Sequence, residues 1–454
     1  MRISTCHGGG LTADCGLTGR LFHGYCRDMH PATHRLAPTD EANLVLDHAG
    51  QVNVFLVAGL LKPGGFLAPD GTPDMARLRA VLRERIAELP ALRKRAVQVG
   101  RRHHWVESTP DVEHHVRLME PVDGLAGLQD RCAELMGQPL AGDRPLWEIL
   151  LVPGATARGL GVVLRIHHAV ADGMTAAVIV QQLFDPGEPG EKAANEPPTR
   201  GLAEAPRAHP RKDPRRILRR LRTGLHRIRK TLWGRGVGGT VLLGERSAHH
   251  GVAFLSAETE ALETTVRPRG ATVNDALLAA AGAGFRAALM AAGEPVPAWL
   301  PVSEPVALRR RGSAGNQVGV MLVRLPLGEP DPDERLRLIA AQTREEKVQA
   351  RDQGTLEFMR GPIGARIMDR LARRQHLVAG FVTNVPGPEG TFRLAGAPVV
   401  ALWPVAVLAG NVRFGVAAVS YAGNLCCGIH FDASNVPGDV FAQAMGEELA
   451  RLGQ

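Results

Sequence analysis

The chain has 454 residues, of which 44% are hydrophobic, enough for two or three globular domains with substantial cores. The formal net charge is +8, but twelve basic residues and a single acid lie within residues 207–235, so the rest of the chain is mildly acidic. That basic segment holds one aromatic residue and no nucleic-acid motif, which argues against a nucleic-acid partner, and the six cysteines contain no C-x-x-C, which favours a reducing, cytoplasmic setting.

The N-terminal segment, residues 1–35, is predicted to lie outside the folded protein. Its first 28 residues are rich in glycine and cysteine and have no periodicity, so either they are disordered or Met29 is the true start. N-terminal sequencing of the natively expressed protein would decide between these alternatives. No signal peptide or membrane span is predicted anywhere, because the longest uncharged apolar stretch, 395–410, is short and contains two prolines.

A first α/β region is predicted over residues 36–185. Helical and extended spacings of apolar residues alternate along it. The clearest elements are helices at 73–88, 125–136 and 174–184 and strands at 147–152 and 160–166.

The segment His167-His168-Ala-Val-Ala-Asp172-Gly173 joins the last of these strands to the last helix. A strand end fixes an imidazole ring, a glycine permits a tight turn, and a carboxylate four residues beyond the second ring can orient its surroundings. The corner is therefore a candidate general-base site.

Two other interpretations of this corner stay open. Asp172 is also suited to capping the helix, and His167, His168 and Asp172 are possible metal ligands. Adjacent histidines at a strand end point apart and no third ligand cluster is evident, so no metal site is predicted. The remaining histidine pairs lack the flanking strand and Asp-Gly, and are expected to be surface or half-buried pairs: 103–104, 114–115 and 249–250.

Residues 186–250 are predicted to be a linker that carries a basic amphipathic helix at 214–233. Its apolar residues, among them Leu221 and Leu225, recur every three or four positions, and arginines fill the other face, among them Arg215, Arg219 and Arg222. Such a helix suits the surface of an anionic membrane or a lipid body. A helix docked on the protein itself is the main alternative, and nucleic-acid binding is the other.

A second α/β region is predicted over residues 251–454. Thr272 and Asp275 fit a capping box at the start of a helix that ends near residue 290. The adjacent Cys426 and Cys427 are expected on opposite faces of a strand. The predicted elements are helices at 272–290, 333–350 and 439–452, strands at 322–327 and 381–385, and a hairpin formed by 412–421 and 425–431.

Several motifs line up along the chain: Pro145-Leu-Trp-Glu148, His167 to Gly173, Val273-Asn-Asp-Ala-Leu-Leu-Ala279, Pro305-Val-Ala-Leu-Arg309 with Gly315-Asn316, Thr383-Asn-Val-Pro-Gly-Pro388, and Ser420-Tyr-Ala-Gly423 with Asp432. This series resembles the bacterial wax ester synthase/diacylglycerol acyltransferase family, one of the CoA-dependent acyltransferases with an HHxxxDG site. The resemblance covers roughly residues 36–453. It implies an α/β fold of two similar chloramphenicol-acetyltransferase-like halves, each with a mixed sheet, meeting along a central tunnel.

The resemblance also implies roles for residues at the matching positions. His168 would be the general base, His167 a structural support, and Asp172 an orienting residue paired with Arg309; a surface position is the alternative for Arg309. Candidates for the oxyanion site or the tunnel wall are Thr383, Asn384 and Asn274. The alternatives are that the first two shape the turn before Pro386 and that Asn274 belongs to a helix cap.

The implied reaction transfers a long-chain acyl group from acyl-CoA, a co-substrate, to diacylglycerol or a long-chain alcohol, without a cofactor or metal. The protein would then be cytoplasmic and peripherally bound to the inner membrane or lipid bodies through residues 207–235. Three departures from the family pattern bear on substrate preference: Asn53-Val-Phe-Leu56 replaces a usual Met-His, Ala307 replaces a usual serine, and the basic linker is unusually rich in arginine. A polyketide or glycolipid acceptor, or a catalytically silent lipid-binding relative, are the alternative functions.

Overall fold

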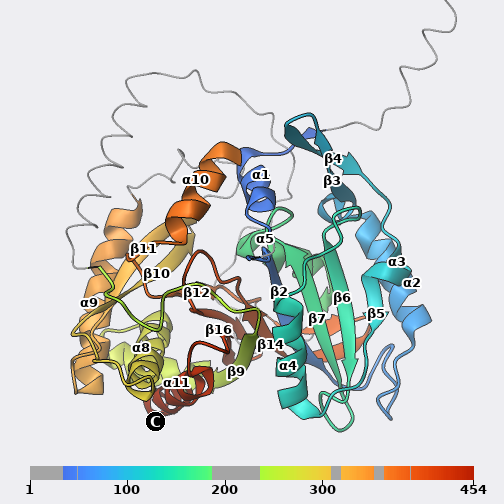
Figure 1. Ribbon diagram of the computed structural model, residues 1–454. Coiled ribbons are helices and arrows are strands. Elements are labelled where there is room, and N and C mark those ends of the chain that lie inside the picture. Colours follow the sequence, from blue (N-terminus) through green and yellow to red (C-terminus); the bar gives the residue numbers. More distant parts are fainter. Residues whose placement is uncertain (1–33, 49, 187–235, 308–317, 352–361, 389) are drawn as a thin grey trace, which may run out of the picture.

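The computed structural model describes residues 34–48, 50–186, 236–307, 318–351, 362–388 and 390–454. The hypothesis of a start at Met29, the predicted basic helix at 214–233 and the position of Arg309 therefore lie outside the described residues. What is described forms two α/β halves, each built on a mixed sheet, side by side in Figure 1. This confirms the predicted fold class.

The first half contains the elements that the apolar periodicities predict, and several more. The predicted helices at 73–88, 125–136 and 174–184 correspond to α2, α4 and α5. The elements are β1 (His34–Arg35), α1 (Pro38–Val45), β2 (Val54–Leu61), α2 (Met75–Ala87), a 3-10 turn (Pro90–Leu92), β3 (Lys94–Val99), β4 (Arg102–Glu107), α3 (Val112–His115), β5 (Val116–Leu118), α4 (Gly124–Met136), β6 (Trp147–Pro153), β7 (Leu160–His167), α5 (Gly173–Leu183) and β8 (Asp185–Pro186).

The second half shows the same agreement, with additional strands that the sequence left unassigned. Its helix α8 begins with the predicted capping box of Thr272 and Asp275. The elements are β9 (His250–Glu258), α7 (Thr259–Val266), a 3-10 turn (Arg267–Arg269), α8 (Val273–Ala291), β10 (Leu300–Ala307), β11 (Val318–Leu325), α9 (Pro332–Arg351), α10 (Pro362–Ala372), β12 (Phe381–Val385), β13 (Phe392–Leu394), β14 (Ala397–Val405), β15 (Phe414–Tyr421), β16 (Asn424–Asp432) and α11 (Gly438–Leu452).

The sheet of the first half has the order β5-β6-β7-β2-β14-β13-β8. Its inner strand β7 is buried along its whole length, which explains why residues 160–166 are an apolar run without alternation. Because β7 lies between β6 and β2, its C-terminal end, which carries the histidine pair, is held on both sides by backbone hydrogen bonds.

Two strands of this sheet come from the second half of the sequence. After β12, the chain crosses over, and β13 and β14 join the first sheet, with β14 antiparallel to β2 from Val399↔Leu61 to Val405↔Leu56. The chain then returns to β15 and β16 in the other sheet. The two halves are thus connected by strand exchange as well as by the linker.

The sheet of the second half has the order β11-β10-β12-β15-β16-β9, and α8 and α11 belong to the core on one of its faces. The predicted divergence of the two neighbouring cysteines is confirmed: Cys427 belongs to this core, whereas Cys426 belongs to the core of the first half. Strand β16 therefore separates the two cores. At Gly428 it passes so close to Pro404 of β14 that any side chain would overlap the Pro404 carbonyl.

A third, three-stranded sheet, β1-β4-β3, packs beside the corner that follows β7. Trp105 of β4, Leu36 and Ala169 form a small apolar cluster of their own. Because Ala169 follows His168 directly, the packing of Ala169 in this cluster helps to fix the corner.

Candidate active site

His168 lies immediately after β7, and its backbone is fixed from two directions. Its amide donates a hydrogen bond of 3.0 Å to the carbonyl of Asn53, and its own carbonyl accepts one of 3.1 Å from the Asn43 side-chain amide. Asn53 is itself held, because its side-chain amide donates to the Asn43 carbonyl at 2.8 Å. The backbone that carries the His168 ring is thereby fixed by residues of the first half.

His167 is fully occupied by contacts inside the protein. It is 1% exposed, its Nε2 lies 3.2 Å from Asp47 Oδ2, and its Nδ1 accepts a hydrogen bond of 2.9 Å from the Ala169 amide. Because an amide can only donate, the ring proton is assigned to Nε2 and is shared with Asp47. No ring nitrogen of His167 is left for a substrate.

The ring of His168 has a different environment. It is half-buried, its centroid lies 4.8 Å from that of Phe55, and neither nitrogen has a hydrogen-bond partner among the described residues. Burial lowers the pKa of His168 to about 4, and the neighbouring His167 adds to the decrease. The ring is therefore neutral at physiological pH, the form that accepts a proton.

This decrease predicts an unusual pH profile. We expect kcat/KM, measured with acyl-CoA and a water-soluble alcohol, to stay level as the pH falls through 6.5 and to decline only toward about 4, because the base is active when unprotonated. Circular dichroism at each pH would separate this loss from unfolding. An acid limb at the ordinary histidine value, near 6.5, would contradict the assignment of His168 as the titrating base.

Asp172 occupies the N-cap of α5. Its carboxylate accepts a hydrogen bond of 2.7 Å from the Thr175 amide, so the capping interpretation describes its local geometry. Since Arg309 lies outside the described residues, the proposed pair of Asp172 with Arg309 stays a prediction.

The second half meets this corner at the end of β12. A Cβ placed on Gly173 would lie 3.4 Å from Val385 Cγ2, so the start of α5 touches the end of that strand. Thr383 is on the same face of β12 as Val385, because side chains alternate along a strand. Asn384 shares the opposite face with Val382, which belongs to the core of the second half.

Asn274 lies on the helix-covered side of the second sheet. Its side-chain amide donates a hydrogen bond of 2.8 Å to Glu304, a buried residue of β10. The next residue, Asp275, accepts from Thr272 and, at 2.6 Å, from the Thr343 hydroxyl. This pair of side chains thus ties the start of α8 to its neighbours.

The Pro-Leu-Trp-Glu motif lies at the start of β6, next to the end of β7 that carries the histidine pair. Trp147 stacks on His115 at 4.4 Å, and its indole nitrogen donates to the Leu92 carbonyl at 2.9 Å. Glu148 is ion-paired with Arg165 of β7, and both are buried. His115 is 2% exposed, so the expectation that the pair at 114–115 is at most half-buried was wrong for this residue, which Trp147 covers.

Sequence reasoning missed Asn43, Asp47 and Asn53, the residues that hold the histidine pair. Their positions are separated from it by more than a hundred residues, and no local spacing connects them. One signal was present: Asn53, a polar residue at the head of an apolar strand, stands where the resembled family usually has Met-His.

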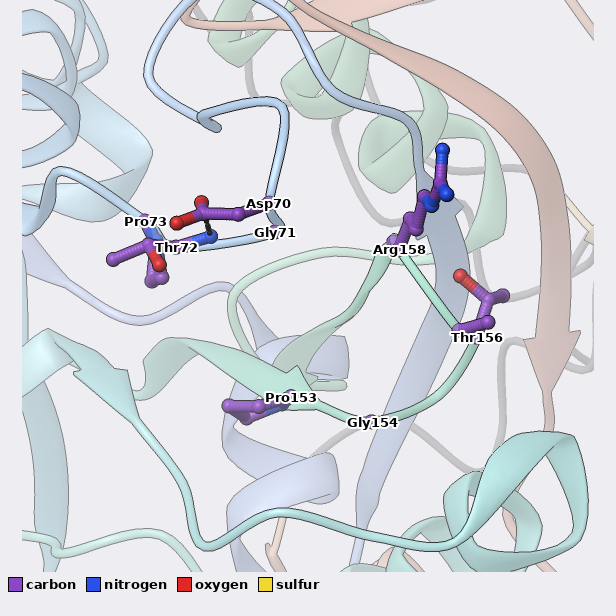
Figure 2. Close-up of a pocket in the computed structure, with 10 residues that line it drawn as sticks. Asp70, Gly71, Thr72, Pro73, Pro153, Gly154, Thr156 and Arg158 are labelled. Carbon is purple, nitrogen blue, oxygen red and sulfur yellow. Dashed lines mark hydrogen bonds between the residues drawn. The ribbon is translucent and has the colours of Figure 1, made fainter.

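A surface pocket lies at the other end of β7, away from the corner. Figure 2 shows its two walls, the turn of Asp70 to Pro73 and the loop of Pro153 to Gly159 that precedes β7. The eight residues of β7 place it about 25 Å from the histidine pair at the usual rise per residue. It is therefore separate from the candidate active site. Within the described ranges, no group of three or more His, Cys, Asp or Glu side chains is arranged to hold a metal ion.

Comparison with known proteins identifies the family. Residues 36–280 match the model of the wax ester synthase/diacylglycerol acyltransferase catalytic domain, and residues 314–453 match the WS/DGAT C-terminal domain. The chain belongs to the wax ester synthase/diacylglycerol acyltransferase family. This confirms the resemblance that the ordered motifs indicate. It is an acyl-CoA-dependent acyltransferase, with acyl-CoA as its co-substrate.

Individual relatives agree with this family. The chain is 28% identical over 412 residues to a Mycobacterium tuberculosis protein named "Probable diacyglycerol O-acyltransferase tgs1", covering 85% of this chain and 88% of that protein. Among solved structures, the wax ester synthase/diacylglycerol acyltransferase of Marinobacter aquaeolei VT8 has a TM-score of 0.67 at 22% identity and covers 92% of this chain and 100% of that one.

The fold extends to proteins of other names. The first condensation domain of the CDA synthetase has a TM-score of 0.57 at 17% identity, covering 93% of this chain and 95% of that chain. The trichothecene 15-O-acetyltransferase of Fusarium sporotrichioides has a TM-score of 0.61 at 9% identity and covers 93% and 94%. No helix among the described residues of this WS/DGAT-family protein is long and apolar enough to span a membrane.

Proposed function

We propose that this WS/DGAT-family enzyme esterifies diacylglycerol or a long-chain alcohol with a long-chain acyl group from acyl-CoA, and that His168 is its general base. The observation that carries the proposal is the neutral, half-buried His168, whose ring nitrogens have no hydrogen-bond partner among the described residues. The contact of β12 with the start of α5, five residues further along the chain, brings the second half to the same corner. The acceptor class is favoured by relatives named for diacylglycerol and wax ester synthesis.

The reaction that follows is direct transfer. The acceptor hydroxyl gives its proton to an open ring nitrogen of His168 while its oxygen attacks the thioester carbonyl carbon. The tetrahedral intermediate breaks its carbon–sulfur bond, and the imidazolium returns the proton to the CoA sulfur. An ester and CoA thiol are the products. Because the low pKa of His168 disfavours the imidazolium, this return of the proton is favourable.

Thr383 is the better candidate for a donor to the oxyanion. It shares a face of β12 with Val385, which touches Gly173, whereas Asn384 is on the face of the buried Val382. A hydroxyl aimed at the developing negative charge stabilises the intermediate without reorganisation. Asn274, already bonded to Glu304, is assigned a structural role.

The remaining residues of the corner are positioning residues in this proposal. Asp47 and the buried His167 hold the segment that carries His168, and Asp172 orients the turn through its cap on α5. The pair of Asp172 with Arg309 would add a contact from the second half. The tunnel that joins the thioester to the acceptor belongs to the same proposal.

An association with an anionic membrane or lipid body through residues 207–235 also belongs to this proposal. The basic, amphipathic spacing of that segment supports it, with Leu221 and Leu225 on the apolar stripe and Arg215, Arg219 and Arg222 on the other face.

A panel of acceptors tests the function. Purified enzyme is incubated with labelled palmitoyl-CoA and with detergent-dispersed diolein, hexadecanol or a short-chain alcohol, and the products are separated by thin-layer chromatography. We expect labelled triacylglycerol or wax ester. Release of CoA with no ester from any lipid acceptor, while polyketide or glycolipid acceptors are esterified, would contradict the proposed acceptor class.

A further inference from the structure

Helix α10 (Pro362–Ala372) has one face that packs against the protein. Ala365 is 3% exposed, and the Asp369 carboxylate lies 3.6 Å from His48 Nε2 and is ion-paired with Arg373 at 2.9 Å. Residues 365, 369 and 372 lie on one side of the helix at the usual rotation of 100° per residue. This side faces α1 and the loop that follows it, and Figure 1 shows the two helices next to each other.

The opposite side of α10 is apolar and open. Ile367 is 56% exposed and Leu371 is 59% exposed, and because they are four residues apart they form one patch. Arg366 and Arg370, also four apart and both exposed, line the edge of this patch. An ordinary surface helix has its apolar stripe inside and its charges outside, so this outward pair of aliphatic side chains beside two arginines is the arrangement expected of a docking face.

The patch lies close to the catalytic corner in the fold. The side of α10 opposite to it contacts His48, the residue after Asp47, and Asp47 is the hydrogen-bond partner of His167. If a hydrophobic acceptor enters the protein at this end on its way to His168, the membrane that it leaves would be in contact with α10. The combination of two aliphatic side chains with flanking arginines fits the boundary between acyl chains and phosphate headgroups.

We infer that α10 docks the enzyme on an anionic phospholipid surface, with Ile367 and Leu371 entering the acyl-chain boundary and Arg366 and Arg370 contacting phosphates. The inference rests on the proposed function, since a membrane-resident acceptor is what gives the docking its use. It concerns a surface of the second half, distinct from the segment 207–235.

Vesicle flotation of the full-length protein tests the docking. Vesicles of phosphatidylcholine with phosphatidylglycerol are compared with vesicles of phosphatidylcholine alone. We expect the double variant Ile367→Ser/Leu371→Ser to bind the anionic vesicles about tenfold more weakly, because it loses apolar insertion. Arg366→Ser/Arg370→Ser is expected to lose much of the preference for phosphatidylglycerol and to show a weaker dependence on salt.

Met290→Ser is the matched control, because Met290 is equally exposed, at 59%, but lies at the end of α8. We expect it to bind as the unaltered protein does. Unchanged binding of the Ile367→Ser/Leu371→Ser variant, or an equal loss in Met290→Ser, would overturn the inference.

Turnover measurements keep this inference separate from the proposed function. The Ile367→Ser/Leu371→Ser variant should lose activity on diolein embedded in vesicles, yet keep the kcat of the unaltered enzyme on a water-soluble short-chain alcohol. Equal losses on both acceptors would show a general defect and overturn the docking role. Absence of ester from both detergent-dispersed diolein and hexadecanol in the unaltered enzyme would instead contradict the proposed acceptor class, whatever the vesicle binding.

Discussion

His168→Ala is expected to lower kcat by about 10²–10⁴-fold, the usual contribution of a positioned general base. The protein should still fold, because the ring of His168 makes no hydrogen bond to a described residue and is only half-buried. Backbone contacts to Asn53 and Asn43 do not involve the ring and would persist in the variant. The measurement is a single-turnover assay with radiolabelled acyl-CoA, which separates chemistry from product release.

Asp47→Asn gives the informative comparison. It keeps the base but removes the charge from the hydrogen bond to His167, so we expect a smaller fall in kcat with KM for acyl-CoA unchanged. Thermal melting of both variants should stay close to that of the unaltered enzyme. A fully active His168→Ala enzyme would contradict the assignment of His168 as the general base and, with it, the proposed mechanism.

Glu148→Ala is expected to destabilise the protein by about 3–5 kcal/mol, because it leaves a buried guanidinium without its counter-ion. Arg165 is 2% exposed and also donates to the Leu135 carbonyl at 2.8 Å, so it cannot move to water without breaking the first core. Arg117, bonded to the other carboxylate oxygen at 2.6 Å, loses its partner as well. Urea denaturation monitored by tryptophan fluorescence measures the effect, since Trp147 precedes this pair.

A surface ion pair on α4 provides the control. Glu134, whose carboxylate lies 2.9 Å from Arg131, has a side chain that is 56% exposed. Glu134→Ala should cost at most about 1 kcal/mol. If Glu148→Ala were no more destabilising than Glu134→Ala, the stabilising role assigned to the buried pair of Glu148 and Arg165 would be contradicted.

Most elements of the fold were predictable because their side chains repeat with the period of the element. The long helix at 272–290 has both a capping box and a periodic apolar face, and the structure begins α8 one residue after the Thr272 cap. By contrast, nothing in the sequences of β13 and β14 predicts which of the two sheets they join. Their sequence predicts extended structure at most, and only long-range packing decides that they join the sheet of the first half.

The residues of the candidate site also fall into a group that local sequence predicts and a group that only tertiary structure brings together. His168 and Asp172 lie within one local motif, and their placement at a strand-to-helix corner follows from the flanking periodicities. The residues that hold the histidine pair act through hydrogen bonds across a long sequence separation, Asp47 to His167 and Asn53 to His168, and no local spacing connects them to the motif. The choice between Thr383 and Asn384 depended on which face of β12 touches Gly173, a fact of tertiary structure.

The exchanged strand β14 limits how substrates reach the centre. Because β14 is held in the first sheet by its ladder with β2, the chain that leads into it from β12 and back to β15 tethers the two halves at two further points and limits how far they can separate. If the proposed long-chain substrates are the true ones, they would have to enter lengthwise between the tethered halves, with side chains and connecting loops moving aside. Neither half is a self-sufficient folding unit either, because the first sheet is completed by residues synthesised late in translation.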